Sequence, residues 1–556
     1  MNTLSHIDRA AALESMAADG IDVLVIGGGI TGAAVAYEAA VAGFTVGLVE
    51  KGDYASGTSS KSTKLAHGGI RYLPQMDFAL VHEALVERGR LFHNAPWLVK
   101  PIEFVLPLYD WSKKPLGVPF APPGGAGLPA MVDGGLELYD TLAGRLNVHH
   151  HSRLSVDDVV ARAPSLSLQG LRTAFAYFDG RTDDVRLTLA NLRSALAGGA
   201  KLANYASVIG FETSDGAITT ALVQDLLTGA DYAIRARHIV NATGVHAAAI
   251  EALTGMPSQI AISAAKGVHL LVSANRLPVT DAALVLPETD DGRLMFIIPW
   301  RGAVLIGTTD TEGGDVDSPA TTRDDVRYLL DHCNRYLTPQ LTEADVISTM
   351  AGYRPLITRT GKSSRRLSRS HLLHDGPCGM VTITGGKLTT SRIMAEQTVA
   401  HIARRDGRRF RSGTRDRVLD GGERWPLDWD ALAARYPIGD LTADAREHIA
   451  ESYGGNTPEL LRLFSESSAF ALPLDRLLPY VAGEVVYACR YEGAQTLEDV
   501  LERRTRIALE SHDHGTGIAP TVAAIMATEL NWDENLAQRE VGTFAANCRV
   551  RYGVAE

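Results

Sequence analysis

The amino-acid sequence predicts an α/β fold in three parts: a discontinuous domain built on a parallel sheet, an inserted domain with an antiparallel sheet, and a C-terminal α-helical domain. Three observations support this division. A strand–helix–strand pattern with closely spaced glycines occupies residues 21–51. Apolar strands that are separated by turns, without helices between them, occupy residues 266–310. Beyond about residue 440 the pattern becomes helical.

The length and composition limit the class of protein. A chain of 556 residues is too long for a single core, so two or three domains are expected. The net charge of -11 argues against a nucleic-acid-binding protein and requires any anion site to be local. The four cysteines lie far apart without a CxxC pair, which predicts a reducing compartment and no structural zinc. The N-terminus lacks the apolar core of a signal peptide, so none is expected. The sequence contains no run of 18 apolar residues, so no membrane span is expected either.

The glycine motif of the first domain predicts a dinucleotide site. Gly27, Gly29 and Gly32 follow a short apolar strand and precede an alanine-rich helix that extends to about Ala42. The three glycines permit the tight turn, the approach of a pyrophosphate and the packing of the helix against the strand. The next strand ends in Glu50, where a carboxylate can accept hydrogen bonds from a ribose and disfavours a 2′-phosphate. The motif therefore predicts a Rossmann-like domain for FAD or NAD.

Two later glycine-marked strand ends favour FAD. The strand in "HIVNATG" ends in Ala242, Thr243 and Gly244, a marker of two-dinucleotide flavoproteins. A strand before Gly385 and Gly386 leads into a long helix, whose first backbone N–H groups can hold an electron-rich ring edge. Three such ends, hundreds of residues apart, are typical of one extended cofactor lying across a discontinuous domain.

The predicted domain boundaries follow from these patterns. The FAD-binding domain takes residues 15–110, 180–245 and 350–405, and the substrate-binding cap takes residues 111–179 and 246–349. The basic stretch at 404–417 indicates a linker, which is taken as residues 406–440, before a helical domain at 441–556. In that domain, Thr496 and Asp499 predict a capping box for one amphipathic helix, with tail packing or oligomerisation as its role.

Three other features have open interpretations. The uncharged stretch 115–131 contains too much proline and glycine for a regular helix, and it reads as a surface loop or a membrane-touching loop. The histidines at 149–151 are consecutive, so their side chains should diverge and no metal site is expected. Asp183 and Asp184 are expected to cap the following helix.

From residue 21 to residue 548 the chain resembles the FAD-dependent (aerobic, respiratory) glycerol-3-phosphate dehydrogenase family. The resemblance rests on "VIGGGITGAAVAYEAA", "GTSSKSTKLAHGGIRYL", "RTDDVRLTLANL", "HIVNATG", "KGVHLLV", "IGTTD", "GYRPL" and "GGKLTT", in this order. It implies a site in which the segment 58–72 lies along the flavin and the substrate.

The resemblance also assigns residues. It implies catalytic roles for His67, His269, Arg354 and Lys387, and substrate contacts by Arg71, Tyr72, His269, Arg354 and Lys387. The implied cofactor contacts are Gly27, Gly29, Gly32, Glu50, Lys51, Thr58, Ser59, Ser60, Lys64, Leu65, His67, Gly68, Val208, Ala242, Thr243, Gly244, Asp310, Gly385, Gly386, Lys387, Leu388 and Thr389. A phosphate dianion calls for arginine and lysine on separate segments, and a secondary alcohol calls for a base, so the residue types agree.

Structural roles remain open for several of these residues. Arg71 and Arg354 are also candidates for structural salt bridges, and His67 for ordering the flavin segment without touching a proton. His269 falls in an apolar strand, where a hydrogen-bonded core histidine is common. Asp310 fits a turn or the flavin edge better than a base.

The implied activity is oxidation of sn-glycerol 3-phosphate to dihydroxyacetone phosphate, with hydride transfer from C2 to the N5 atom of a non-covalently bound FAD. Electrons would pass to a membrane quinone, so the protein would lie on the inner face of the cytoplasmic membrane as a peripheral protein, and a homodimer is one oligomeric state left open. The alternatives are an oxidase that uses oxygen and, from another class, a flavin-binding redox sensor without turnover. No inserted segment of the oxidase type is evident, which favours the dehydrogenase.

Overall fold

The computed structural model describes residues 3–118, 127–358, 371–439 and 441–555. Its first layer is an eight-stranded sheet in which β18, β19, β10, β1, β2 and β7 lie in this order and β8 and β9 extend β10 as an antiparallel ribbon. The strands are β1 (Ile21–Ile26), β2 (Val46–Val49), β7 (Lys201–Ala203), β8 (Ala206–Ser214), β9 (Ala217–Asp225), β10 (Asp231–Asn241), β18 (Leu372–Asp375) and β19 (Val381–Thr384). β7, β2, β1, β10 and β19 are mutually parallel, as the first glycine motif predicts.

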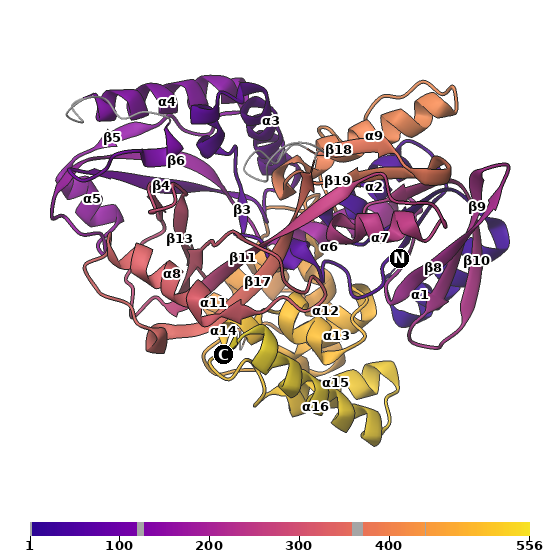
Figure 1. Cartoon of the computed structure of the whole chain (residues 1–556). Helices are drawn as coiled ribbons and strands as arrows, with labels where there is room; N and C mark the ends of the chain where they lie inside the picture. The colour runs from indigo at the N-terminus through magenta and orange to yellow at the C-terminus, as the bar shows by residue number, and fades with distance from the viewer. Residues whose placement is uncertain (1–2, 119–126, 359–370, 440, 556) are drawn as a thin grey trace.

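Helices cover both faces of this sheet (Figure 1). On one face α2 (Ile30–Val41), α6 (Asp184–Ala197) and α9 (Ser391–Arg405) share a core with Val23 and Val25 of β1. On the other face α1 (His6–Asp19) and the β8–β9 ribbon pack against Leu24 and Ile26 of the same strand. A strand that is buried on both sides reads as a continuous apolar run, which is why "VLVI" carries no alternation.

The second layer is a ten-stranded mixed sheet in the order β15, β11, β14, β13, β12, β4, β6, β3, with β17 beside β11 and β5 beside β6. Its strands are β3 (Leu65–Ala66), β4 (Lys100–Tyr109), β5 (Ser152–Leu154), β6 (Leu171–Arg181), β11 (Ala261–Ser273), β12 (Ala283–Leu286), β13 (Met295–Trp300), β14 (Ala303–Gly307), β15 (Thr311–Glu312) and β17 (Val346–Thr358). The predicted antiparallel pairing of β11, β14 and β13 is confirmed.

Alternating residues of β4 separate two cores. Phe104, Leu106 and Leu108 pack in the core that includes α3 (Phe78–Asn94) and α4 (Leu128–Ala143). Val105 and Tyr109 pack in the core on the opposite face. The elements there are α5 (Val156–Arg162) and α8 (Arg323–Asn334). The short helix α7 (Ala247–Ala252) follows β10.

The C-terminal region is helical, as predicted. Its helices are α10 (Trp429–Ala433), α11 (Ala443–Tyr453), α12 (Thr457–Glu466), α13 (Ala482–Tyr491), α14 (Ile507–Glu510), α15 (Ala519–Leu530) and α16 (Glu534–Arg551). The chain then ends in β20 (Val554–Ala555), which pairs with β16 (Thr321–Thr322) of the cap.

Several predicted boundaries need correction. β4 lies in the mixed sheet, so residues 100–109 belong to the cap and not to the FAD-binding domain. β17 pairs with β11 along most of its length, so the cap extends beyond residue 350. Both strands carry apolar residues that fit either sheet, and their partners are distant in sequence.

The stretch predicted as a linker is packed against the first domain. The backbone N–H of Gly413 donates to the Glu38 carboxylate of α2, which also accepts bonds from the hydroxyls of Ser412 and Thr414. Asn94 of α3 donates to the carbonyl of Thr414. Although this stretch is basic in composition, its residues 412–414 are held against the first domain by hydrogen bonds and do not form a free linker.

The uncharged stretch 115–131 is also corrected in part. α4 begins at Leu128, since Pro129 falls in the first turn, where the missing N–H costs nothing. Leu116, Val118 and Leu128 are buried within the protein, so they are not available to a membrane, and Phe120 lies outside the described residues. Within the described part of the chain, no helix combines the length and the apolarity that a membrane crossing requires.

Candidate active site

The first glycine turn has the geometry that the motif predicts. Gly27 has a φ of +113°, and a Cβ atom there would lie 2.8 Å from the carbonyl oxygen of Ala242 at the end of β10. A Cβ atom on Gly32 would lie 1.9 Å from the carbonyl oxygen of Gly27, so α2 could not approach the turn with a larger residue. Gly29 is the N-cap of α2. The turn is therefore closed by β10 on one side and by its own helix on the other.

Polar side chains complete this nucleotide end. Glu50, at the end of β2, accepts hydrogen bonds from the backbone N–H groups of Gly28 (2.6 Å) and Gly52 (2.8 Å). Burial raises the pKa of this carboxyl, although the two N–H groups oppose that shift. Ser59 accepts a bond of 2.9 Å from the N–H of Ile30 in the first turn of α2.

The two other glycine-marked strand ends lie beside this turn in the sheet. β10, next to β1, leads into Ala242, Thr243 and Gly244, and Gly244 has a φ of +60°. β19, next to β10, leads into Gly385 and Gly386, whose φ angles are +77° and +72°. The carboxyl ends of parallel neighbours meet at one edge of a sheet, so the three sequence markers converge there, as predicted.

A cationic cluster lies at the other end of the segment 58–72. Arg71 donates to the phenol oxygen of Tyr72 (2.8 Å), and the Lys387 ammonium lies 4.3 Å from the centre of the Tyr72 ring. The Nζ of Lys387 and the Nε of Arg71 are buried, and neither donates a hydrogen bond to any described residue. Burial, followed by the charge of Arg71, lowers the pKa of Lys387 to about 7. Two neighbouring cationic side chains, each with a buried nitrogen that lacks a hydrogen-bond partner among the described residues, are the observation that points to an anionic ligand.

His67 lies between the cluster and the glycine end of β19. Its backbone N–H donates to the Thr389 hydroxyl (3.0 Å), which fixes the segment against the start of α9. Burial, and then the charges of Lys387 and Arg71, lower the pKa of His67 to about 3. The side chain is neutral at physiological pH, while the backbone has the ordering role.

His269 lies in β11 with its ring held from two sides. Its Nε2 is 3.0 Å from the hydroxyl of Thr63, and a Cβ atom on Gly307 of β14 would be 2.2 Å from its Cδ2. Its Nδ1 is buried without a hydrogen-bond partner among the described residues. Burial, then Arg354 and Lys64, keep its pKa well below the usual value. A neutral imidazole with an unused ring nitrogen can serve as a base.

Arg354 projects from β17 across the neighbouring strand. Its guanidinium fills the space that a Cβ atom on Gly267 of β11 would occupy, 2.4 Å from Nη2. It donates to the Thr308 hydroxyl (3.0 Å), to the Thr309 carbonyl (3.2 Å) and to Asp310 (3.4 Å). These contacts aim the guanidinium, and they give Asp310 a partner within the site.

Several predicted contacts are engaged elsewhere. The Lys64 ammonium is fully buried against Asp184, with both carboxylate oxygens at 2.7 Å, and it also donates to the Ser60 carbonyl. Lys51 forms an exposed ion pair with Asp317. Val208 packs in the core beneath β1, and Leu65 is buried in β3. For these residues any cofactor contact is limited to the backbone or to a side chain that is already paired.

The remaining predicted contacts border the site. Thr58 donates to the Tyr353 carbonyl, and Ser60 donates to the Gly57 carbonyl. The N–H of Gly68 donates to Asp179 (3.1 Å), and a Cβ atom on Gly68 would clash with Leu85. Leu388 and Thr389 form the turn before α9. The predicted divergence of the 149–151 histidines holds for His149 alone, which packs on Phe178, because His150 (3.6 Å) and His151 (2.7 Å) both pair with Asp140.

Sequence reasoning missed three supports of the site. Thr63 contacts His269, Asp179 holds Gly68, and Asp184 holds Lys64 instead of acting only as a helix cap. Asp183 does cap α6, by accepting bonds from Val185 and Arg186. The one available signal was the pair of adjacent acids in "RTDDVR", where a cap needs only one.

The residues present fit FAD. The glycine turn admits no side chain at Gly27 or Gly32, the Glu50 carboxylate lies beside the turn at Gly28, and Lys387, whose Nζ has no hydrogen-bond partner among the described residues, directly follows the Gly385–Gly386 turn. Glycine cradles of this kind accept a pyrophosphate and a ring edge.

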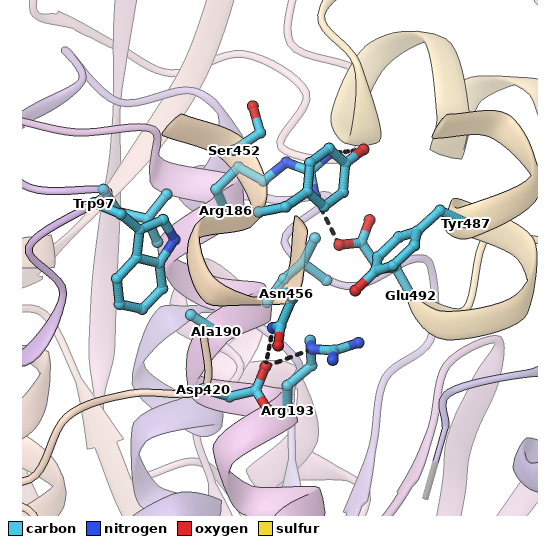
Figure 2. Close-up of a pocket in the computed structure, with 12 residues that line it drawn as sticks. Trp97, Arg186, Ala190, Arg193, Asp420, Ser452, Asn456, Tyr487 and Glu492 are labelled. Atoms are coloured by element: carbon cyan, nitrogen blue, oxygen red, sulfur yellow. Dashed lines mark hydrogen bonds and ion pairs between the residues drawn. The ribbon is translucent and has the colours of Figure 1, made fainter. Parts of the chain in front are cut away.

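The cavity shown in Figure 2 lies away from all of these residues, between α6 and the C-terminal helices. Arg186 pairs there with Glu492 (2.6 Å) and Arg193 pairs with Asp420 (2.7 Å). Its volume of about 20 Å³ holds roughly one water molecule. It is a gap in a polar domain interface and not a substrate site.

Known protein families match two parts of the chain. Residues 22–401 match the family of FAD-dependent oxidoreductases, and residues 412–537 match the C-terminal domain of alpha-glycerophosphate oxidase. The second match begins inside the stretch predicted as a linker.

Individual relatives cover nearly the whole chain. A glycerol-3-phosphate dehydrogenase of Mycobacterium leprae is 35% identical over 98% of this chain and 91% of its own length. Glycerol-3-phosphate dehydrogenase 2 of Mycobacterium tuberculosis is 34% identical over 98% and 90%. The structure of the Bacillus halodurans glycerol-3-phosphate dehydrogenase complexed with FAD superposes with a TM-score of 0.80 at 29% identity, covering 99% of this chain and 98% of that one. The chain is thus an FAD-dependent oxidoreductase that belongs to the glycerol-3-phosphate dehydrogenase family.

Proposed function

We propose that the protein oxidises sn-glycerol 3-phosphate to dihydroxyacetone phosphate and that a membrane quinone accepts the electrons. The observation that carries the substrate assignment is the pair of buried, unsatisfied cationic atoms on Arg71 and Lys387. A phosphate dianion would give both a partner and remove the penalty of leaving them unpaired. Arg354 lies on a separate segment of the same site and is the third candidate phosphate contact.

The residues of the chain have distinct roles in this proposal. Arg71, Lys387 and Arg354 bind the phosphate, and Tyr72 packs against the first two and orients them. His269 takes the proton of the C2 hydroxyl, because its imidazole is neutral and its Nδ1 is unused. Bound FAD, held without a covalent link, supplies the acceptor for the C2 hydride. His67 orders the segment between the phosphate end and the start of α9.

The electron acceptor has two candidates. The relatives named as dehydrogenases favour an acceptor other than oxygen. Our proposal takes this acceptor to be a quinone, and with it a peripheral position on the inner face of the cytoplasmic membrane. The match of residues 412–537 to an oxidase domain favours oxygen as the second candidate. The membrane contact must use side chains other than Leu116, Val118 and Leu128, because these are buried.

One anaerobic experiment tests both halves. The purified yellow protein is mixed with sn-glycerol 3-phosphate, or with glycerol as control, and flavin absorbance is followed. Bleaching by the phosphate ester alone is expected. Reoxidation is then titrated with a soluble quinone analogue and with oxygen. A flavin that stays oxidised would contradict the substrate assignment. If oxygen reoxidises the flavin faster than the quinone analogue does, oxygen and not a quinone is the electron acceptor. Acid precipitation should release all of the colour into the supernatant, because the FAD is not covalently held.

A further inference from the structure

A C-terminal arginine reaches the interior of the first domain. Arg506 lies between a π-helical turn (Asp499–Arg504) and α14, and its side chain is only 3% exposed. Its Nη2 donates to Asp184 (2.6 Å) and to Asp183 (2.8 Å), both at the start of α6. The predicted single helix over this region is wrong, since the chain breaks at Thr505 and turns this arginine inward. A charge that is buried so deeply persists only with a well-placed partner.

Asp184, which binds Arg506, also forms hydrogen bonds with Ser62 and Lys64, the residues on both sides of Thr63. It accepts bonds from the N–H of Ser62 (3.0 Å) and from the Ser62 hydroxyl (2.7 Å). Its two oxygens also accept the Lys64 ammonium. Lys64 has a φ of +60°, a conformation that non-glycine residues adopt only where their surroundings hold it. Thr63, between the two, is therefore fixed in position by a single carboxylate.

Thr63 in turn contacts the candidate base. Its hydroxyl lies 3.0 Å from Nε2 of His269, on a ring that Gly307 confines from another side. A hydrogen bond at one ring nitrogen selects the tautomer and so decides whether the other nitrogen carries a lone pair. Asp179 accepts a hydrogen bond from Gly68 in a similar way. Its other hydrogen bonds among the described residues come from Tyr139 and Arg88, and not from the ring of His67 or His269.

We propose that Arg506 and Asp184 are positioning residues of the active site: they hold residues 62–64 so that the Thr63 hydroxyl fixes the orientation and tautomer of His269. The C-terminal domain thereby contributes to proton removal without touching substrate. This inference rests on the proposed function for the role of His269, whereas the contact that it concerns can be measured without turnover.

The test uses the FAD-loaded full chain with Thr63→Val, Thr63→Ser and Arg506→Lys. Thr63→Val keeps the shape and removes the hydroxyl. It should slow anaerobic flavin reduction at saturating sn-glycerol 3-phosphate by about tenfold, with KM changed by less than about twofold. Thr63→Ser should restore most of the rate. Arg506→Lys keeps the positive charge but loses the two-pronged contact with both aspartates, so it should also slow flavin reduction.

A spectroscopic readout separates positioning from general destabilisation. With ¹⁵N-labelled histidine, the His269 ring resonances, assigned by their loss in His269→Gln, should shift toward a mixture of tautomers in Thr63→Val and Arg506→Lys. Arg9→Lys, in the equally buried pair with Asp225, is the matched control and should leave both the rate and these resonances unchanged.

Each outcome decides one point. Parent-like rates and His269 resonances in Thr63→Val would overturn the proposal, and parent-like behaviour of Arg506→Lys would remove that arginine from it. If sn-glycerol 3-phosphate fails to reduce the parent flavin, the proposed function fails. The resonances of the oxidised proteins would still report on the contact between Thr63 and His269.

Discussion

The two ends of the site differ in how far the chain satisfies its own polar groups. At the nucleotide end, the Glu50 carboxylate already bonds to Gly28 and Gly52, and Ser59 bonds to the first turn of α2. At the substrate end, the Lys387 ammonium, the Arg71 Nε and the His269 Nδ1 are buried without hydrogen-bond partners in the described chain. The polar groups of the first end are therefore preorganised by the protein, whereas the buried polar atoms of the second end need a ligand to complete their hydrogen bonds.

The largest effect is expected at the unsatisfied end, from His269→Gln. Loss of a general base costs about 10²- to 10⁴-fold in rate, so kcat should fall by that factor while FAD content stays at the parent level. Stopped-flow reduction by sn-glycerol 3-phosphate measures the rate, and the flavin-to-protein absorbance ratio measures the content. A loss of less than about threefold would show that His269 is a core histidine.

Arg71→Gln should affect only substrates that carry a phosphate. A hydrogen bond to a charged group is worth about 1.5–3 kcal/mol, so kcat/KM for sn-glycerol 3-phosphate should fall about ten- to a hundredfold. With glycerol, which has no phosphate, the change should stay within about threefold. Equal losses for the two substrates would mean that Arg71 has a structural role.

Lys387 should make substrate binding dependent on pH. Its pKa of about 7 lies below the usual value for lysine, so the free protein loses this proton as the pH rises through 7. A phosphate dianion favours the charged lysine, so binding above pH 7 must take up a proton, and KM should rise by up to about tenfold per pH unit. Below pH 7 the lysine contribution is constant. Lys387→Met should raise KM and remove this slope, and a slope that persists would assign the titration to another group.

The smallest effect is expected at the preorganised end, from Glu50→Gln. The amide keeps an oxygen for one backbone N–H but presents an NH₂ group to the other, so the turn loses one charge-assisted bond. FAD affinity should weaken by about tenfold, measured by fluorescence titration of the deflavinated protein, with little change in kcat once FAD is saturating. A large fall in kcat at saturating FAD would show that the two ends are not independent.

The parts of the fold that local sequence determines were predictable. The turn at Gly27–Gly32, the helix after it and the turn at Gly385–Gly386 follow from residues within about ten positions of each other, and all are confirmed. The unsatisfied cations were found through the family resemblance and not through spacing, because Arg71 and Lys387 are more than 300 positions apart in the chain.

The errors have a common physical cause in long-range contacts. The prediction places residues 100–109 in the FAD-binding domain and not in the mixed sheet, because the partners of β4, which are β6 and β12, are far along the chain. The basic composition of 406–417 suggested a linker, although Glu38 of α2 binds three of its residues. The helical pattern over 496–511 fits one amphipathic helix, but Asp53 and Asp184, which bind Arg504 and Arg506, are more than 300 residues earlier.

The buried arginines of the C-terminal segment make this domain difficult to exchange between proteins. Arg503 and Arg504 both donate to Asp53, three residues after Glu50, with distances of 2.6 Å to the same oxygen. A gene fusion or truncation that replaced everything after residue 405 would leave the carboxylates of Asp53, Asp183 and Asp184 in the interior without the arginines that bind them. Although the two family matches divide the chain near residue 410, buried ion pairs such as Arg504–Asp53 and Arg506–Asp183 cross that division, so replacing either part alone would leave buried charges without these partners.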